Sequence, residues 1–191
     1  MLKMAEWSFW MTDSMNPILI QAIGFVGVLF FIISYQIKSN RMLFLLQLLG
    51  TAMFCCQFLL LGATSGAANL IGIMVRNALL IKYRDWAWVR SKWTEIIFLI
   101  FFTAAFIATW QGLISLLPYA AVVSTTIAYW IDNAQKIRLG NLACGSPCWL
   151  IYDVLIGSWA GVLNESITLG SIIVSIWRYG WKAMGSSDSG F

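Results

Sequence analysis

Three side chains that can carry charge or form strong hydrogen bonds stand in a stretch otherwise typical of a lipid-buried helix. Asp153, Asn164 and Glu165 interrupt the apolar run 148–166. A carboxyl or amide group inside a bilayer is costly unless it has a polar partner or a water-filled path, so such residues mark candidate functional sites. Trp149 precedes Asp153 by four residues and shares its helix face. An aromatic ring, a carboxylate and an amide could therefore converge on one polar solute.

Residues of similar type recur in the first half of the chain at a constant offset. Asn69 and Asn164 are 95 residues apart, and Phe54 stands in the place of Trp149. The same offset aligns glycines at expected turns and helix contacts, namely Gly50 with Gly145, Gly62 with Gly157 and Gly66 with Gly161. We interpret this as an internal repeat. The alternative is a chance alignment of leucine-rich helices.

The composition predicts the elements that must hold these residues. Of the 191 residues, 60% are hydrophobic and 10% are charged, and none is His. Apolar runs of roughly twenty residues, the length needed to span a bilayer, alternate with short polar breaks. We place seven spans at 17–37, 42–62, 65–84, 94–110, 112–131, 139–157 and 160–179. The start of the chain lacks the apolar core and cleavage site of a signal peptide.

The basic residues predict an orientation for these spans. Seven spans bring ten of the twelve Lys and Arg residues to one side of the membrane: Lys38, Arg41, Lys82, Arg84, Arg90, Lys92, Lys136, Arg138, Arg178 and Lys182. The positive-inside rule then places the N-terminus outside and the C-terminus in the cytoplasm. The topology thus accounts for the excess of basic over acidic residues. We therefore expect the lipid bilayer rather than nucleic acid as the partner. Tryptophans near the ends of the spans are typical of aromatic belts at the two interfaces.

The offset of 95 residues corresponds to four predicted spans, and this predicts how the two halves of the chain are arranged. Spans one to three would repeat as spans five to seven, with span four as a linker that lets both halves enter the membrane in the same direction. The predicted fold is an all-α polytopic membrane protein with two parallel three-helix bundles in a 3+1+3 order. The bundles would occupy 1–85 and 112–182, the linker helix 86–111 and a short cytoplasmic tail 183–191.

Polar residues inside the spans have two interpretations. Asn164, Thr168 and Ser171 share one face of span seven, and Asn69 and Arg76 share one face of span three. They could line a solute pathway, or they could form hydrogen bonds between helices. Arg76 could be a gate or a structural arginine bonded to carbonyls. Asp153 and Glu165 could also lie near enough to the headgroups to be hydrated.

Several segments resemble known families of small-solute carriers. WLIYDVLIGSWAGVLN resembles the Trp–Tyr–Gly stretch and following Asn of SWEET and SemiSWEET sugar carriers, and SYQIKSNRM lies where the PQ-loop family carries its Pro-Gln. Here Tyr35 replaces that proline and Gln36 remains. The length and the pattern SPCWLIY…GSWAGVLNE are similar to the bacterial inner-membrane family called YgjV. PnuC vitamin carriers share the predicted architecture.

The resemblance and the residues together indicate a facilitated carrier in the bacterial inner membrane. It would move a small polar solute, sugar-like or nucleoside- or vitamin-like, by alternating access. We expect Asn69, Asn164, Trp149, Phe54 and Asp153 to bind the solute. The expected gate or pathway residues are Arg76, Glu165, Thr168, Ser171 and Gln36. The alternative is a membrane receptor or scaffold that binds a ligand in the same pocket without moving it.

Other classes of chemistry find little support in the sequence. It contains no nucleotide-binding loop, nucleophile–base pair or metal-ligand cluster, so we expect no enzymatic activity, no cofactor and no metal. Cys55, Cys56, Cys144 and Cys148 fall within spans and are expected to be reduced thiols. The identity of the solute, ion coupling and the oligomeric state, a homo-oligomer included, stay open.

Cysteine labelling tests the predicted topology. A reporter cysteine at Ser65 or Ser158 should react with a membrane-impermeant maleimide added outside the cell, because both positions fall in outer connections. Reporters at Ser39 and Ser91 should react only after the membrane is opened. External labelling at Ser39 would exclude the seven-span topology.

Overall fold

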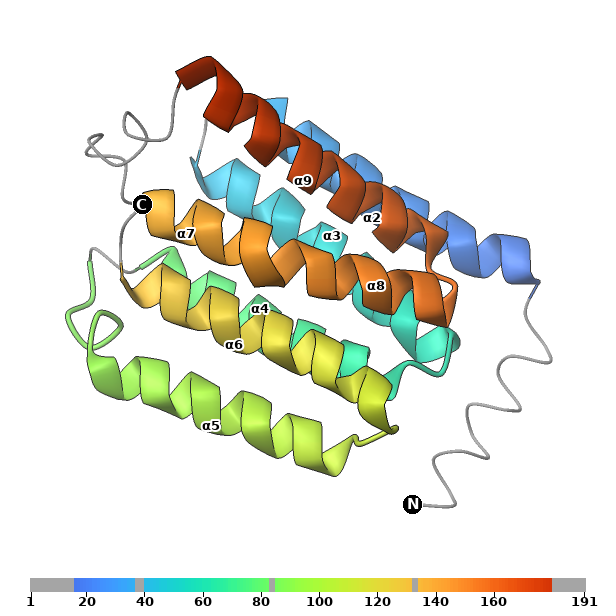
Figure 1. Ribbon diagram of the computed structural model, residues 1–191, viewed down its shortest axis with the longest axis horizontal. Helices are drawn as coiled ribbons and strands as arrows, with labels where there is room; N and C mark the ends of the chain where they lie inside the picture. Colours follow the sequence, from blue (N-terminus) through green and yellow to red (C-terminus); the bar gives the residue numbers. More distant parts are fainter. Residues whose placement is uncertain (1–15, 37–39, 83–84, 132–133, 180–191) are drawn as a thin grey trace.

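The computed structural model describes residues 16–36, 40–82, 85–131 and 134–179, and all regular structure in these ranges is helical. The helices are α2 (Pro17–Gln36), α3 (Asn40–Leu60), α4 (Thr64–Leu80), α5 (Lys92–Ala108), the 3-10 helix η1 (Leu113–Ser115), α6 (Leu116–Trp130), α7 (Ala134–Gly140), the π-helix η2 (Asn141–Gly145), α8 (Ser146–Ile156) and α9 (Trp159–Tyr179). Figure 1 shows α7 and α8 as one continuous rod. The described chain therefore forms seven helical rods, which confirms the predicted all-helical fold.

The helices agree with the predicted spans except near some ends. The described residues contain four helical segments long and apolar enough to cross a membrane, at Pro17–Ser34, Leu113–Trp130, Lys136–Ile156 and Trp159–Arg178. Helices α4 and α5 have 17 residues each. At 1.5 Å rise per residue they are about 26 Å long, slightly less than a typical hydrocarbon core. The predicted third span, 65–84, was too long because α4 ends at Leu80.

Local sequence explains where several helices begin and end. The Asn16 side chain accepts a hydrogen bond from the Ile18 amide, and Pro17 occupies the first position of α2, where a missing amide hydrogen is harmless. Ser91 caps α5 by accepting from the Trp93 amide. Gly62 and Gly157 follow α3 and α8 with φ angles of 72° and 73°. This left-handed conformation reverses the chain within a short turn.

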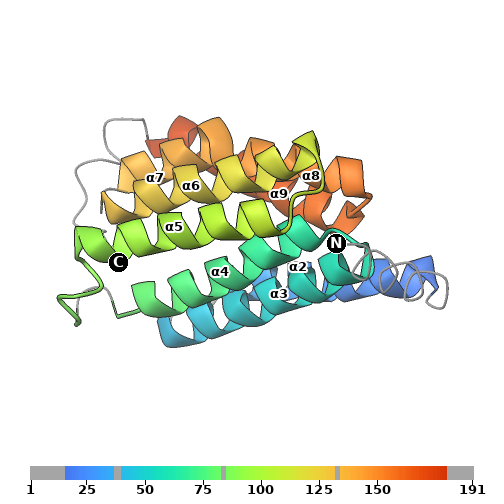
Figure 2. The same cartoon turned by 90° about the horizontal axis from the view of Figure 1, so that it is seen from below.

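The six rods other than α5 form a closed ring. Each contacts the next in the order α2, α3, α4, α6, α7–α8 and α9, and α9 contacts α2. Figure 2 shows this ring as two layers, with α2, α3 and α4 in one and α6, α7–α8 and α9 in the other. Helix α5 lies at the edge of the layers and contacts α4 and α6. Helix α3 lies between α2 and α4 in one layer, and α7–α8 lies between α6 and α9 in the other, so the order in space follows the order in the sequence.

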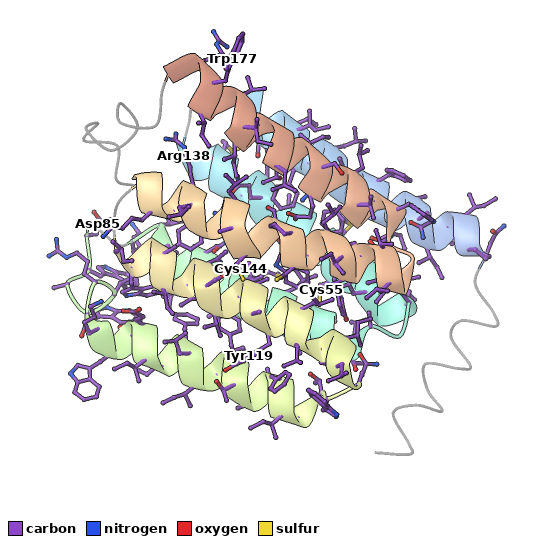
Figure 3. The ribbon with its side chains drawn as sticks, viewed as in Figure 1. Cys55, Asp85, Tyr119, Arg138, Cys144 and Trp177 are labelled. Atoms are coloured by element: carbon purple, nitrogen blue, oxygen red, sulfur yellow. The ribbon has the colours of Figure 1, made fainter. Side chains whose placement is uncertain are left out.

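The polarity of the molecule is inverted relative to a water-soluble protein. Among the fully buried side chains are Gln57, Asn69, Thr126 and Ser158, and Arg76 is only 3% exposed. Large apolar side chains cover the outer surface, as Trp177 does, which is 85% exposed and points away from the helices in Figure 3. Such an exterior suits lipid, while polar groups inside must bond to one another.

We name the two ends of the ring by their connections. The turn end carries the connections 61–63, 109–112 and 157–158, and the charged end carries the connection from α4 to α5 and the end of α9. Exposed tryptophans lie at both ends, Trp110 and Trp159 at the turn end and Trp86, Trp88, Trp93 and Trp177 at the charged end. Ser65 and Ser158 are fully buried, so Leu113, which is 78% exposed, is the better reporter for the turn end.

The turn at Gly157 gives a test of the fold. Gly157→Ala should lower the free energy of unfolding by about 1–2 kcal/mol, because a Cβ atom is strained at a φ of 73°. The measurement is the melting temperature of the purified protein in detergent. Gly170→Ala is the matched control, since a Cβ there meets nothing within 4 Å and alanine favours helix. Equal destabilisation by both changes would contradict the left-handed turn.

Candidate functional site

A cavity of about 340 Å³ lies inside the ring and is lined by side chains from both layers. Its wall includes residues of α3, α4, α6, α8 and α9, with Phe31 contributed by α2. It extends from Phe58, near the turn end, to Tyr129, near the charged end. A concave space of this size between membrane helices suits a small molecule.

Aromatic rings form part of the cavity wall. The Phe58 ring centroid is 6.1 Å from that of Trp149, and Phe31 and Phe54 are separated by the same distance. These rings come from both layers, since Phe31, Phe54 and Phe58 belong to α2 and α3 whereas Trp149 belongs to α8. A planar or ring-shaped solute could therefore be held between two apolar surfaces.

Carboxyl and amide groups gather at the turn end of the cavity. Asp153 of α8 is 2% exposed, and its Oδ1 atom has no hydrogen-bond partner among the described residues. The carboxyl packs against Gly161 of α9, where an added Cβ would lie 2.4 Å from Asp153 Cγ. On α9, Asn164 Nδ2 donates to Glu165 Oε1 at 3.2 Å. The bare glycine backbone allows α8 and α9 to approach closely enough to bring these groups together.

Arg76 lies toward the opposite end of the same cavity. Its Nη1 donates to Thr126 Oγ1 at 2.7 Å and to Thr125 Oγ1 at 3.3 Å, and its Nε donates to Asn77 Oδ1 at 3.3 Å. The guanidinium carbon also lies 4.8 Å from the centre of the Tyr129 ring. These contacts join α4 to α6 across the layers. Arg76 thus joins the two helices through side-chain oxygens rather than the expected carbonyls, and it also lines the cavity, whereas its role as a gate stays a prediction.

The rod α7–α8 is wound differently where it passes the cavity. Asn141–Gly145 forms a π-helix just before Pro147, which lacks the amide hydrogen needed for a regular α-helical bond. Asn141 and Ser146, at the two ends of this segment, both line the cavity. Short π segments inside α-helices are frequent at functional sites because they redirect side chains.

A network of neutral hydrogen bonds closes the cavity at the turn end. Gln57 of α3 is fully buried, and its Oε1 accepts from Ser158 Oγ at 3.2 Å. Gln57 Nε2 donates to Gln21 Oε1 at 3.1 Å, and Gln21 Nε2 donates to the Gly157 carbonyl at 2.7 Å. The network joins α2 and α3 to the turn between α8 and α9.

A second link between the layers joins α4 to α8. The Gly66 amide at the start of α4 donates to the Tyr152 hydroxyl of α8 at 3.0 Å, and Tyr152 is 1% exposed. Gly66 again permits the approach, since an added Cβ would lie 2.6 Å from atoms of Tyr152 and Phe58. In this conformation the two layers are thus joined at the turn end by the network around Gln57 and by the Gly66–Tyr152 bond.

The structure brings seven of the ten predicted site residues to one cavity. The cavity-lining residues are Phe54, Arg76, Trp149, Asp153, Asn164, Glu165 and Thr168. They come from four helices and are far apart in the sequence. Their convergence is the geometry that the sequence pattern led us to expect, whereas their role in binding stays a prediction.

The other three predicted residues are placed differently. Asn69 is fully buried beside the cavity rather than in its wall, because its Nδ2 bonds the Ser65 carbonyl at 2.9 Å. Asn69 and Asn164 therefore do not face the cavity as equivalents in this conformation. Ser171 is exposed on the outer face of α9, because the cavity follows Asn164, Thr168 and Ile172. The Gln36 side chain lies outside the described residues.

Sequence reasoning missed several residues that shape the site. Tyr129 and Thr125 surround Arg76, Phe58 faces Trp149, and Gln57 and Tyr152 close the turn end. One signal could have found the last pair. Gln57 and Tyr152 are 95 residues apart, the offset that relates the two asparagines.

The cysteines are reduced in this structure. Cys144 and Cys148 lie with their sulfur atoms 3.7 Å apart, and all four thiols are free. The described ranges contain no group of three or more His, Cys, Asp or Glu residues that could hold a metal ion.

The fold and the site define a polytopic helical membrane protein with a polar, aromatic-walled cavity between two layers of helices. The family model Imp-YgjV, described as bacterial inner membrane protein, matches residues 18–183. The chain belongs to this family, which confirms the YgjV resemblance and assigns the chain to the bacterial inner membrane. No curated protein and no solved structure matches it.

The contacts of Arg76 give a prediction about stability. Thr126→Val removes the acceptor at 2.7 Å and leaves a buried cation less well bonded. We expect a loss of about 1–3 kcal/mol in the free energy of unfolding. The measurement is thermal denaturation in detergent.

Thr103→Val is the control, because the Thr103 hydroxyl contacts the Leu99 carbonyl and the Tyr119 hydroxyl and no charged group. It should lower the melting temperature less than Thr126→Val. Equal shifts would show that the Arg76–Thr126 bond contributes nothing particular to the link between α4 and α6.

Proposed function

We propose that the protein is a carrier that moves a small polar solute across the inner membrane by alternating access. The observation that carries the proposal is the cavity itself, in which aromatic rings and buried polar groups from both layers face one space. Polar and ionisable groups inside a membrane are expensive and usually mark a substrate pathway. The solute would be sugar-like or nucleoside- or vitamin-like, with rings to stack and polar groups to bond.

The relation between the two layers supports a carrier of the SWEET and PQ-loop type. The contacts between helices are equivalent in the two layers. Helix α2 contacts α3 as α6 contacts α7–α8, and α3 contacts α4 as α8 contacts α9. The contact that joins α4 to α6 corresponds to the contact that joins α9 to α2. Gly62 and Gly157, which the offset of 95 aligns, have φ angles of 72° and 73°. Two similar halves packed around one cavity are typical of carriers that rock about a central site.

The state of the turn end supports alternating access. The cavity is closed there by neutral hydrogen bonds, from Ser158 to Gln57 and from the Gly66 amide to Tyr152. Each such bond contributes only about 0.5–1.5 kcal/mol net, so the two layers can separate at this end without breaking an ion pair. Opening the turn end while the charged end closes would move a solute from one side to the other.

The distribution of charge supports an orientation. The exposed basic residues Arg90, Lys92, Lys136 and Arg178 all lie toward the charged end. By the positive-inside rule the charged end would face the cytoplasm and the turn end the outside. The present conformation would then be closed to the outside.

A counterflow assay tests transport directly. A thermal-shift screen of sugars, nucleosides and vitamins on the purified protein identifies a ligand, which is then loaded into proteoliposomes. Unlabelled ligand inside should drive uptake of labelled ligand from outside. A receptor or scaffold would bind the ligand and show no exchange, which would refute the carrier.

Substitutions in the cavity should weaken binding of that ligand. Trp149→Ala removes a stacking surface, and Asn164→Ala removes an amide that faces the cavity. Each should reduce affinity roughly tenfold to a hundredfold, since leaving ligand polar groups unpaired costs about 1–3 kcal/mol. Asn69→Ala should reduce affinity as well if both repeats bind the solute during transport. The readout is isothermal titration calorimetry on monodisperse protein.

Ser171→Ala is the matched control on the same helix, because Ser171 is exposed on its outer face. It should bind the ligand like the wild type. Unchanged affinity in both Trp149→Ala and Asn164→Ala would mean that the solute binds elsewhere.

A further inference from the structure

We propose that the solute is dipolar, with a cationic group held by Asp153 and Glu165 and an anionic group held by Arg76. This inference rests on the proposed function, because it names the chemical class of solute for the same cavity. An ammonium group and a carboxylate or phosphate group at opposite ends of a ring-containing body would match what the cavity offers.

Among the described residues, no basic side chain lines the turn end of the cavity to match its carboxyl groups. Asp153 Oδ1 has no hydrogen-bond partner among the described residues although the side chain is 98% buried, and Asp153 lines the cavity. Glu165 lines it beside Asp153 and is bonded by the neutral amide of Asn164. The other polar groups near these two carboxyls are the hydroxyls of Ser146 and Ser158, which carry no charge. A protonated amine could donate to the free carboxyl oxygen.

At the charged end of the cavity, no carboxylate among the described residues lines the wall beside the guanidinium groups. Arg76 is 3% exposed, and its acceptors are the neutral oxygens of Thr125, Thr126 and Asn77. Arg138, half-buried on α7, lines the same end of the cavity. Guanidinium groups bind carboxylate and phosphate in paired, planar contacts, which a small anion in this cavity could make.

The ion pairs found in the described residues leave both ends uncompensated. They are Lys82–Asp85 and Lys92–Glu95, which lie at the charged end, outside the cavity. Neither pair includes Arg76, Asp153 or Glu165. A buried charge normally has a partner of opposite sign. A solute with one charge of each sign would supply the missing partner at both ends at once.

The positions of these residues along their helices indicate the size of the solute. Arg76 follows the start of α4 by twelve residues, and Asp153 precedes the end of α8 by three. At 1.5 Å per residue the two Cα atoms differ in depth by roughly 13 Å. The side chains shorten this gap, but a solute must still separate its charges by several bonds. Trp149 stands one helical turn further from the turn end than Asp153 and so lies between the two ends, where its ring would cover the body of the solute.

Rigid aromatic probes test the charge requirement on the purified full chain. The dipolar probe is 4-(aminomethyl)benzoate, and the matched probes are benzylamine, which lacks the anion, and benzoate, which lacks the cation. Isothermal titration calorimetry should show that the dipolar probe binds at least tenfold more tightly than either. Benzoate or benzylamine binding as tightly as the dipolar probe would overturn the proposal.

Substitutions should separate the contributions of the two ends. Asp153→Asn should weaken the dipolar probe and benzylamine at least tenfold and leave benzoate unchanged. Arg76→Gln should weaken the dipolar probe and benzoate and leave benzylamine unchanged. If Arg76→Gln does not fold, Arg138→Gln provides the same test with a half-buried arginine. Arg90→Gln, an exposed charge, is the control and should change nothing. Loss of all three probes together in a well-folded variant would contradict separate charge sites.

A length series tests the spacing. The ω-amino carboxylates from glycine to 8-aminooctanoate carry the same two charges at increasing separation. Affinity should rise with length and then fall, with glycine the weakest. An affinity that does not change with length would overturn the two-ended site.

The same pair of charges could come from a free solute or from the headgroup of phosphatidylethanolamine. Titration of the dipolar probe in nanodiscs of phosphatidylcholine and of phosphatidylethanolamine distinguishes these sources. Competition confined to phosphatidylethanolamine assigns the site to a lipid headgroup, whereas equal binding assigns it to a free solute. Either result supports a dipolar site.

Failure of this inference is distinguishable from failure of the carrier proposal. Counterflow of a neutral sugar, together with no binding of the dipolar probe, would refute the dipolar solute and leave the carrier intact. Tight binding of the dipolar probe without counterflow would support the dipolar site and refute transport.

Discussion

The hydrogen bond from the Gly66 amide to the Tyr152 hydroxyl ties the two layers of helices together at the turn end, and the cavity depends on it. Inside lipid, a polar group can be satisfied only by another protein group, so the layers must meet wherever such groups are buried. Gln57 and Ser158 make the corresponding link in the other direction. With the turn end joined in this way, the space below it is bounded on all sides by helices, and Phe58, Trp149 and Asp153 face inward.

Two kinds of polar interaction have different consequences in this molecule. The links at the turn end are between neutral groups, which form and break at small net cost. The ionisable groups Asp153, Glu165 and Arg76 instead lie in the cavity wall, where a charged form is expensive unless a partner of opposite sign is present. In the proposed carrier, the neutral links would break and form during the conformational change. The ionisable groups would set the selectivity for the solute.

The sequence predicted the helices well because their signals are local. A run of about twenty apolar residues, Pro17 at the start of α2 and Gly157 after α8 each act within one or two turns of chain. The residues gathered in the cavity were also largely predictable, since Asp153, Asn164 and Arg76 are conspicuous in lipid. Asn69 was harder to place: its amide bonds the Ser65 carbonyl one turn earlier in the same helix, and packing decides which face of α4 meets the cavity.

By itself, the sequence determined that this is a helical membrane protein of seven rods with polar groups at defined positions, because hydrophobic length and turn residues act locally. Only the tertiary structure decided which faces of the helices meet. A helix face is set by rotation, so Thr168 enters the cavity whereas Ser171, three residues later, is exposed. The pairing of Arg76 with Thr126, fifty residues away, and the unpaired oxygen of Asp153 likewise arise from packing between helices, which no local pattern encodes.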